Sequence, residues 1–384
     1  MQQVKRIYLD HNASSLIRPS VKQAVLDFLE LNAGNPSSIH GLGRQARACM
    51  DQARDTIAQY LAVPASSIIF TSGATEANHM AWNAFLKPDI NIVSSDTEHP
   101  CILGAQARAQ QNKAQLTLVH CCKQDDFIHA FQLAIKNQNI DFCSLHLANN
   151  ETGIILPIKQ CVNSLLNEGK NKPYLHIDAV QAIVKVNIDE ALAFSDYFTL
   201  SGHKLGALAG SGVLIKKDGV PFKPLWEGSA QEKGRRGGTE NLLGIVAMAA
   251  ACQELSRVEA QEKARCLDLR DQLETAFLSS IPNIEIVGQG QERLGNTSCI
   301  VFQDIDAQAL LVAADLEGID LSTGSACTSG SVEPSHVLLN MGYSKKEASS
   351  ALRFSLGWNN TEQEIQQVCK IFPKLVERAR SIKS

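Results

Sequence analysis

Six short apolar segments along residues 67–201 constrain the fold of this chain more than any other feature. They read SIIF, NIVSS, LTLVH, FCSLHLA, YLHID and YFTLS, and the stretches between them can form helices. Neighbouring parallel strands need such long crossover connections, whereas antiparallel strands do not. The alternation therefore predicts an α/β fold with a mainly parallel sheet and helices on both faces. A seventh segment, SGVLIKK, follows a short glycine-rich link, and we expect it to be an antiparallel neighbour that closes the sheet.

The pattern changes near residue 250, where a long charged helical segment begins. It is followed by the strand NTSCIVF, a helix, the strand ALRFSLG and a final helix. A chain of 384 residues is also longer than one hydrophobic core usually supports. We therefore expect a large domain at 16–250 with a seven-stranded sheet. A smaller α+β domain should combine 251–384 with 1–15, because the opening residues are too few to form a core of their own.

Composition excludes several classes of function. The net charge is −4 and charged residues make up 20% of the chain, so the basic surplus that nucleic-acid binding needs is absent. The start lacks a basic and apolar leader, and the longest apolar run, 244–252, is too short to cross a bilayer. We expect a cytoplasmic protein without nucleic-acid or membrane partners. The eleven cysteines are scattered and form no CxxC motif, so we expect neither a disulfide framework nor a metal site.

Several residues with chemical potential follow the predicted strands, where open α/β sheets bind their ligands. After SIIF comes TSGATE, in which Ala74 and Thr75 open a helix. Small residues there let backbone amides approach a phosphate closely. A plain helix cap completed by Glu76 is the alternative.

Asp178 ends the segment YLHID between apolar neighbours. An acid in such surroundings needs a cation, and a protonated pyridine nitrogen would serve. Ser201, His203 and Lys204 lie in a small-residue turn after YFTLS. A lysine there can form a Schiff base with an aldehyde, with the hydroxyl and imidazole beside it available to a phosphate. For SGHK alone, a solvated loop lysine is the alternative.

Four further residues are candidates for the same site. His99 follows a strand and could stack on a ring and pass protons. Asn150 could offer an amide to the phenolic oxygen of a cofactor or to a carboxylate. Arg353 is a cation on an apolar strand, which indicates a bound anion. Cys327 lies in GSACTSGS, a composition that favours an accessible, flexible loop, so it is the best candidate for a nucleophile. The alternatives are that His99 is a loop histidine with ordinary hydrogen bonds, that Asn150 only forms a turn, and that Cys327 occurs in its loop by chance.

Eleven motifs along nearly the whole chain resemble one family, the cysteine desulfurases of class V of the aminotransferase superfamily. They stand in the family's order and at similar spacing, and they read YLDHNASS, GNPSSIH, FTSGATEAN, TEHP, ANNETG, HIDAVQ, SGHKLG, RRGGTEN, GSACTSGS, EPSHVL and LRFSLG. The resemblance implies a pyridoxal 5'-phosphate enzyme of fold type I that acts as a homodimer. It would convert L-cysteine to L-alanine and keep the sulfur as a persulfide.

The resemblance also implies a role for each matching residue. Lys204 would bind the cofactor covalently, Asp178 would face the pyridine nitrogen, and His99 would stack on the ring. The remaining cofactor ligands would be Gln181 at the phenolic oxygen and Ala74, Thr75, Ser201 and His203 at the phosphate, joined by Thr239 of the other subunit. The substrate carboxylate would be bound by Asn150 and Arg353, and Cys327 would attack the substrate sulfur.

The long stretch 322–336 resembles the branch of the family whose mobile cysteine loop feeds sulfur to an acceptor protein, such as an iron–sulfur scaffold or a sulfur-transfer protein for tRNA thiolation. Two departures concern the ends of the chain: Ser14 and Ser15 replace the usual threonines, and the sequence stops at Ser384 without the further tail of many members. A selenocysteine lyase, a related class V aminotransferase and a catalytically silent binding protein are the alternatives. The joint presence of the lysine, aspartate, histidine and cysteine argues against the silent protein.

Overall fold

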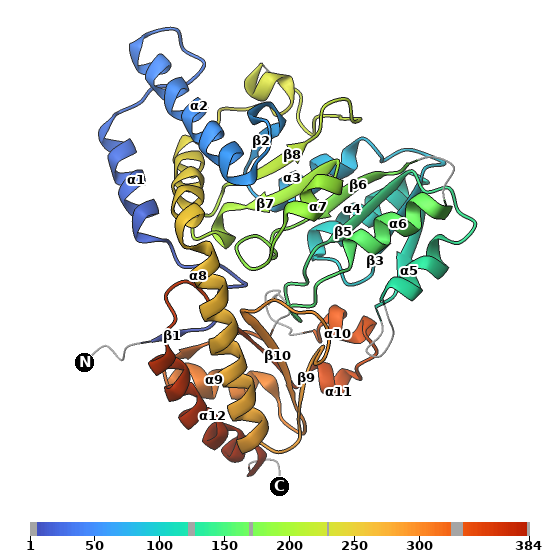
Figure 1. The fold of residues 1–384 in the computed structure, drawn as a ribbon, viewed down its shortest axis with the longest axis vertical. Coiled ribbons are helices and arrows are strands. Elements are labelled where there is room, and N and C mark those ends of the chain that lie inside the picture. The colour runs from blue at the N-terminus through green and yellow to red at the C-terminus, as the bar shows by residue number, and fades with distance from the viewer. Residues whose placement is uncertain (1–5, 122–126, 169–171, 229, 324–332, 382–384) are drawn as a thin grey trace.

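The computed structural model describes residues 6–121, 127–168, 172–228, 230–323 and 333–381. One seven-stranded sheet, one three-stranded sheet and one two-stranded sheet organise these residues. The long helix α8 (Leu242–Ser280) runs past both the large sheet and the smaller ones (Figure 1). No helix among the described residues is long and apolar enough to cross a membrane.

The large sheet contains all seven predicted strands. They are β2 (Ile68–Thr71), β3 (Asn91–Ser95), β4 (Gln115–Val119), β5 (Phe142–His146), β6 (Tyr174–Asp178), β7 (Tyr197–Ser201) and β8 (Gly212–Lys216). Their order is β2-β8-β7-β6-β5-β3-β4. The neighbouring strands from β7 through β6, β5 and β3 to β4 pair in parallel. The predicted α/β fold with a mainly parallel sheet is thus confirmed.

The prediction that the seventh strand closes the sheet is wrong. β8 is antiparallel as expected, but it lies between β7 and β2 and pairs with both. Its residues Val213 and Leu214 are fully buried. A strand buried in this way needs neighbours for the backbone groups on both of its edges, which β2 and β7 supply.

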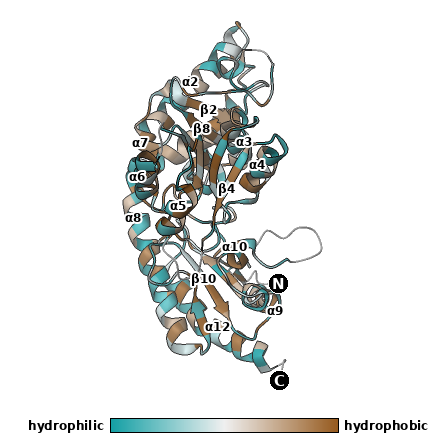
Figure 2. Cartoon of the chain, turned by 90° about the vertical axis from the view of Figure 1, so that its right-hand side faces the viewer, coloured by the Kyte–Doolittle hydropathy of each residue, from teal (hydrophilic) through white to brown (hydrophobic). Residues whose placement is uncertain are grey.

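Helices cover both faces of the large sheet, and adjacent residues of one strand pack into different cores because side chains alternate along a strand. Tyr197 packs with α3 and α4, whereas Phe198 packs into the core that α2, α5, α6 and α8 share. Figure 2 shows the apolar strands enclosed between these helices. The helices of this part are α1 (Pro19–Glu30), α2 (Gly41–Leu61), α3 (Ala74–Asn83), α4 (Pro100–Gln111), α5 (Phe127–Ile135), α6 (Ile158–Glu168) and α7 (Asp189–Phe194).

The remaining elements form a second core. The three-stranded sheet has the order β12-β10-β9, and β1 pairs in parallel with β11. The strands are β1 (Ile7–Tyr8), β9 (Ile284–Ile286), β10 (Thr297–Phe302), β11 (Ile319–Asp320) and β12 (Ala351–Ser355), and the helices are α9 (Ala307–Leu316), α10 (His336–Asn340), α11 (Lys345–Ala348) and α12 (Glu362–Ser381). Ile7 and Leu9 pack in this core. Because α8 supplies residues to both cores, the boundary at residue 250 stays a prediction.

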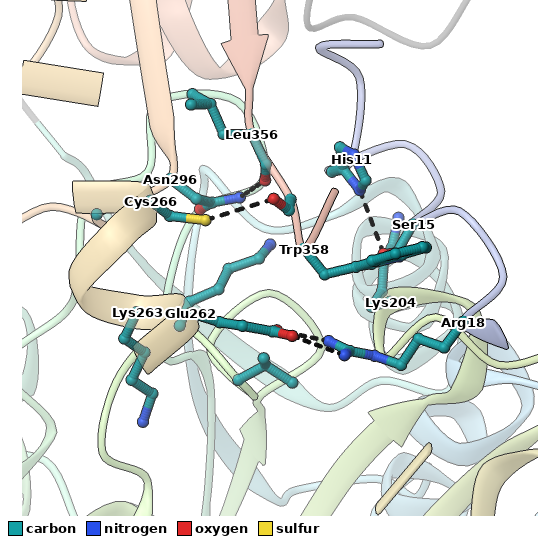
Figure 3. Close-up of a pocket in the computed structure, with 14 residues that line it drawn as sticks. His11, Ser15, Arg18, Lys204, Glu262, Lys263, Cys266, Asn296, Leu356 and Trp358 are labelled. Atoms are coloured by element: carbon teal, nitrogen blue, oxygen red, sulfur yellow. Dashed lines mark hydrogen bonds and ion pairs between the residues drawn. The ribbon is translucent and has the colours of Figure 1, made fainter. Parts of the chain in front are cut away.

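Arg18 anchors the N-terminal segment to α8. Its side chain is 2% exposed, and its guanidinium donates to Glu254 at 2.8 Å. It also donates to Glu262 at 2.7 Å (Figure 3). Its Nε donates to the carbonyl of Leu205 at 2.9 Å. The centre of the Trp358 ring lies 5.9 Å from the guanidinium carbon. One buried cation therefore ties the segment before α1 to the helix that both cores share.

We expect Arg18→Ala to lower the free energy of unfolding by about 3 kcal/mol, because removing one partner of a buried ion pair leaves the other charge uncompensated. Urea denaturation followed by circular dichroism measures this change. The matched control is Arg47→Ala, which removes the exposed Arg47–Asp51 pair and should cost less than about 0.5 kcal/mol. Equal losses in the two variants would contradict the anchoring role of Arg18.

Candidate active site

A cavity of about 750 Å³ opens at the carboxyl ends of the parallel strands, between the large sheet and β12. Parallel strands end at the same edge of a sheet, so the turns that follow them meet there. The cavity is lined by every predicted site residue except Thr239 and Cys327: Ala74, Thr75, His99, Asn150, Asp178, Gln181, Ser201, His203, Lys204 and Arg353. The structure thus brings together residues at or just after the carboxyl ends of five strands with one residue of the distant strand β12. Their roles in catalysis stay predictions.

The turn between β2 and α3 and the first residues of α3 line this cavity. Gly73 precedes α3 with a φ of +154°, and the amides of Ala74 and Thr75 open the helix. A Cβ on Gly212 would lie 2.7 Å from Gly73, so the close approach of β8 requires glycine here. The first amides of a helix lack helical partners and carry partial positive charge, which suits a phosphate.

Glu76 does not complete a helix cap in the way that the alternative interpretation expected, because the N-cap residue is Gly73 and no side chain caps the helix. The Glu76 carboxylate accepts from the backbone amide of Ser72 at 2.7 Å and from Arg236 at 2.8 Å. Burial raises the pKa of Glu76, but the hydrogen bonds from Arg236 and Ser72 outweigh burial and hold it below its usual value. The carboxylate thus ties the turn to the RRGGTEN segment.

Asp178 is a buried carboxylate at the end of β6. Asn78 donates to its Oδ2 at 2.6 Å, and the amide of Val180 donates to its Oδ1 at 3.0 Å. Burial raises the pKa of Asp178. Within the described ranges, no lysine or arginine forms an ion pair with it, so a buried acid faces the cavity without a cation. A protonated ring nitrogen of a ligand would supply that cation.

Lys204 ends the 3₁₀ turn η2 (Gly202–Lys204) directly after β7. Its Nζ donates to the carbonyls of Asn12 and Ala13, the latter at 2.7 Å. Burial and the nearby charge of Arg353 lower the pKa of Lys204 to about 7, although Asp10 and Asp178 oppose this shift. A substantial fraction of the amine is therefore neutral at neutral pH, as a nucleophile requires.

Arg353 reaches the cavity from β12 and is 3% exposed. It donates to Asp10 at 2.7 Å and to the carbonyl of Asn150 at 2.9 Å, while its buried Nε has no hydrogen-bond partner among the described residues. A buried donor without a partner is costly, so a ligand carboxylate is a suitable acceptor.

The contacts of Gln181 differ from the expected ones. Its Nε2 donates to the carbonyl of Asn12 at 2.9 Å, and its Oε1 accepts from Lys185 at 2.6 Å. Both ends of the amide are therefore engaged within the chain. A contact between Gln181 and a phenolic oxygen would have to replace the bond to Asn12.

Two predicted residues stand apart from the cavity. Thr239 is exposed and lines a separate hollow of about 50 Å³ behind the β2–α3 turn, together with Ser72 and Arg236. Cys327 lies in 324–332, outside the described residues.

Sequence reasoning missed Asn12, Asn78 and Cys101. Asn12 and Cys101 line the cavity, and Asn78 bonds to the carboxylate that faces it. Asn12 belongs to YLDHNASS and Asn78 to FTSGATEAN, so both motifs were noticed, but nothing local to them indicates their partners. Cys101 follows TEHP directly, and its distance from His99 of two residues was the one available signal.

Comparisons with known proteins agree with this geometry. The model of the family Aminotransferase class-V matches residues 7–368. Cysteine desulfurase 2 of Trichormus variabilis is 39% identical over 98% of this chain and 94% of its own length. Cysteine desulfurase IscS of Methanosarcina thermophila is 37% identical over the same shares of both chains.

Solved structures show the same fold. A NifS-like protein superposes with a TM-score of 0.87 at 28% identity, covering 97% of this chain and all of its own. A NifS-like protein from Rickettsia africae gives a TM-score of 0.84 at 32% identity over 97% and 99% of the two chains. SspA, solved in complex with cysteine, superposes with a TM-score of 0.75 at 27% identity, covering 91% of this chain and 98% of its own. The chain belongs to the class V aminotransferase family and, within it, to the cysteine desulfurases.

Proposed function

We propose that this protein is a pyridoxal 5'-phosphate-dependent cysteine desulfurase that converts L-cysteine to L-alanine and holds the sulfur as a persulfide on Cys327. The observation that carries the proposal is the pairing, in one cavity, of buried Asp178 without a cation and Lys204 with a lowered pKa. A cofactor with an aldehyde and a protonated ring nitrogen satisfies both residues.

The described residues fit this cofactor at each of its ends. Asp178 would face the ring nitrogen, His99 would stack on the ring, and Lys204 would hold the aldehyde carbon. The phosphate would lie against the amides that open α3 and against Ser201 and His203, which also line the cavity. When bound, this cofactor withdraws electrons from the substrate Cα and makes its proton acidic.

The chain's own groups would then carry the reaction. Lys204, with a pKa lowered to about 7, can take up the Cα proton and return it. The guanidinium of Arg353, which lines the cavity, would orient the substrate carboxylate. The thiolate of Cys327 forms a bond to the substrate sulfur as the C–S bond breaks, and the electron pair stays on carbon, where protonation yields alanine.

The other cysteines support Cys327 as the nucleophile. Burial raises the thiol pKa of Cys101, Cys252 and Cys299 to about 12 and that of Cys121 to about 11, so these four are almost entirely protonated at neutral pH. Ser322, which precedes Cys327 by five positions in the sequence, lines the cavity, and this also supports the assignment.

The similarity to known cysteine desulfurases, such as IscS of Methanosarcina thermophila, extends the proposal to a sulfur acceptor and a second subunit. We infer that the persulfide sulfur passes to an acceptor protein in the cytoplasm, either an iron–sulfur scaffold or a sulfur-transfer protein for tRNA thiolation. The solved complex of SspA with cysteine supports cysteine as the substrate. The exposed position of Thr239, away from its own chain's cavity, supports a homodimer in which each Thr239 completes the partner's phosphate site.

Lys204→Ala should reduce alanine formation at least about a hundredfold, because both the covalent hold on the cofactor and the base are lost. It should also remove the adduct that borohydride traps in the wild type, which peptide mass analysis would locate on Lys204. The control is Lys185→Ala, whose lysine also bonds to Asn12 but should leave the trapped adduct on Lys204. If the trapped adduct persists in Lys204→Ala, the assignment of Lys204 as the residue that binds the cofactor covalently is wrong.

Thr239→Ala should weaken cofactor binding roughly tenfold, the effect of losing one hydrogen bond to a charged group. Fluorescence titration of the apo-protein measures the affinity, and Thr56→Ala, which alters an exposed hydroxyl on α2, serves as the control.

Sedimentation of the wild-type protein should show a dimer. A stable and active monomer at micromolar concentration is the result that rules out the shared site.

Cys327→Ala should bind cofactor and cysteine normally yet release no alanine or sulfide above background, because only the attack on sulfur is lost. In the wild type, brief incubation with cysteine should leave one extra sulfur atom on Cys327, located by peptide mass analysis. If the sulfur is found on Cys101 or Cys299 and Cys327→Ala remains active, the nucleophile has been assigned wrongly, while the cofactor site still stands.

A further inference from the structure

The side chains of His99 and Cys101 meet at the start of α4, on the wall of the cavity. The Sγ of Cys101 lies 3.0 Å from the Nδ1 of His99, and the backbone amide of Cys101 donates to the same Nδ1 at 3.2 Å. His99 is thus both the N-terminal cap of the helix and a neighbour of the thiol.

The backbone contact decides which ring nitrogen carries the proton. Because Nδ1 accepts from an N–H group, it is unprotonated, and a neutral imidazole then carries its proton on Nε2. Burial lowers the pKa of His99; Asp178 opposes the shift, while Lys204 and His336 add to it, so the ring is neutral at neutral pH. A thiol at 3.0 Å from this unprotonated nitrogen is placed to donate to it, sharing the acceptor with the backbone amide.

Asn78 on α3 completes the arrangement around the sulfur. Its Nδ2 donates to the Sγ of Cys101 at 3.2 Å and to the Oδ2 of Asp178 at 2.6 Å. The sulfur therefore accepts one hydrogen bond from Asn78 and keeps its own proton for His99. Burial raises the thiol pKa of Cys101 to about 12, which keeps that proton in place.

We propose that Cys101 is a positioning residue whose thiol donates to Nδ1 of His99, so that the ring is held with its proton on Nε2 and is linked through Asn78 to Asp178. The histidine and the carboxylate, which come from separate strand ends, then keep a constant relative position. Since both the proton and a lone pair of the sulfur are engaged, Cys101 is not a sulfur carrier. This inference rests on the proposed function only where it concerns the role of His99 in the reaction; the hydrogen bonds themselves do not depend on it.

The test is made on the apo-protein labelled with ¹⁵N-histidine, so that it does not depend on activity. The imidazole signals of His99 are assigned by their loss in His99→Asn. In the wild type they should show the neutral ring protonated on Nε2. In Cys101→Ala the Nδ1 signal should shift, and the pKa of His99 should rise by roughly half a unit to one unit, because the hydrogen bond that favours the neutral ring is gone.

Two further variants separate positioning from packing. Cys101→Ser restores a donor and should return the signals and the pKa of His99 to wild-type values. Cys121→Ala is the matched control, because that thiol is also protonated but contacts Ser95 and Thr97 instead of the ring. The proposal is overturned if Cys101→Ala leaves His99 unchanged or if Cys101→Ser behaves like Cys101→Ala. A wild-type His99 with its proton on Nδ1 overturns it without any variant.

Discussion

The hydrogen bonds of one buried residue, Asn12, connect the parts of the molecule that form the site. Asn12 is 1% exposed. Its partners come from both cores: Gln181 and Lys204 at its carbonyl, Lys185 and Asn296 at its Oδ1, the Asn150 carbonyl and Thr297 at its Nδ2, and Ser355 at its amide. A buried polar group is stable only when its partners are in place, so this network specifies how the N-terminal segment, the large sheet and β10–β12 fit together.

The electrostatics of the cavity follow from burial. Burial raises the pKa of Asp178 and lowers that of Lys204, so it disfavours the charged form of each residue. Opposed shifts of an acid and a base in one cleft are typical of a functional site rather than of a structural ion pair. A ligand that carries a cation to the aspartate and an electrophile to the amine relieves both costs, which explains why this cavity suits the proposed cofactor.

Strand-end residues could be predicted because their placement follows from local pattern and sheet geometry. Once the alternation of strands and helices predicts a parallel sheet, residues such as Asp178 and Lys204 must lie at the same edge. The place of β8 could not be predicted, since strand order depends on pairing between distant segments, here β8 with β2. The separate position of Thr239 also depends on how the chain folds back behind the β2–α3 turn.

The sequence by itself determined the fold class, the family and ten of the residues that line the cavity, because periodicity and motif spacing are local properties of the chain. Only the tertiary structure decided what holds those residues in place. Asn12 meets Gln181 across 169 positions, and Asn78 meets Asp178 across 100. Such contacts form when buried polar groups from distant segments must satisfy one another, and no local pattern specifies which partner each will find.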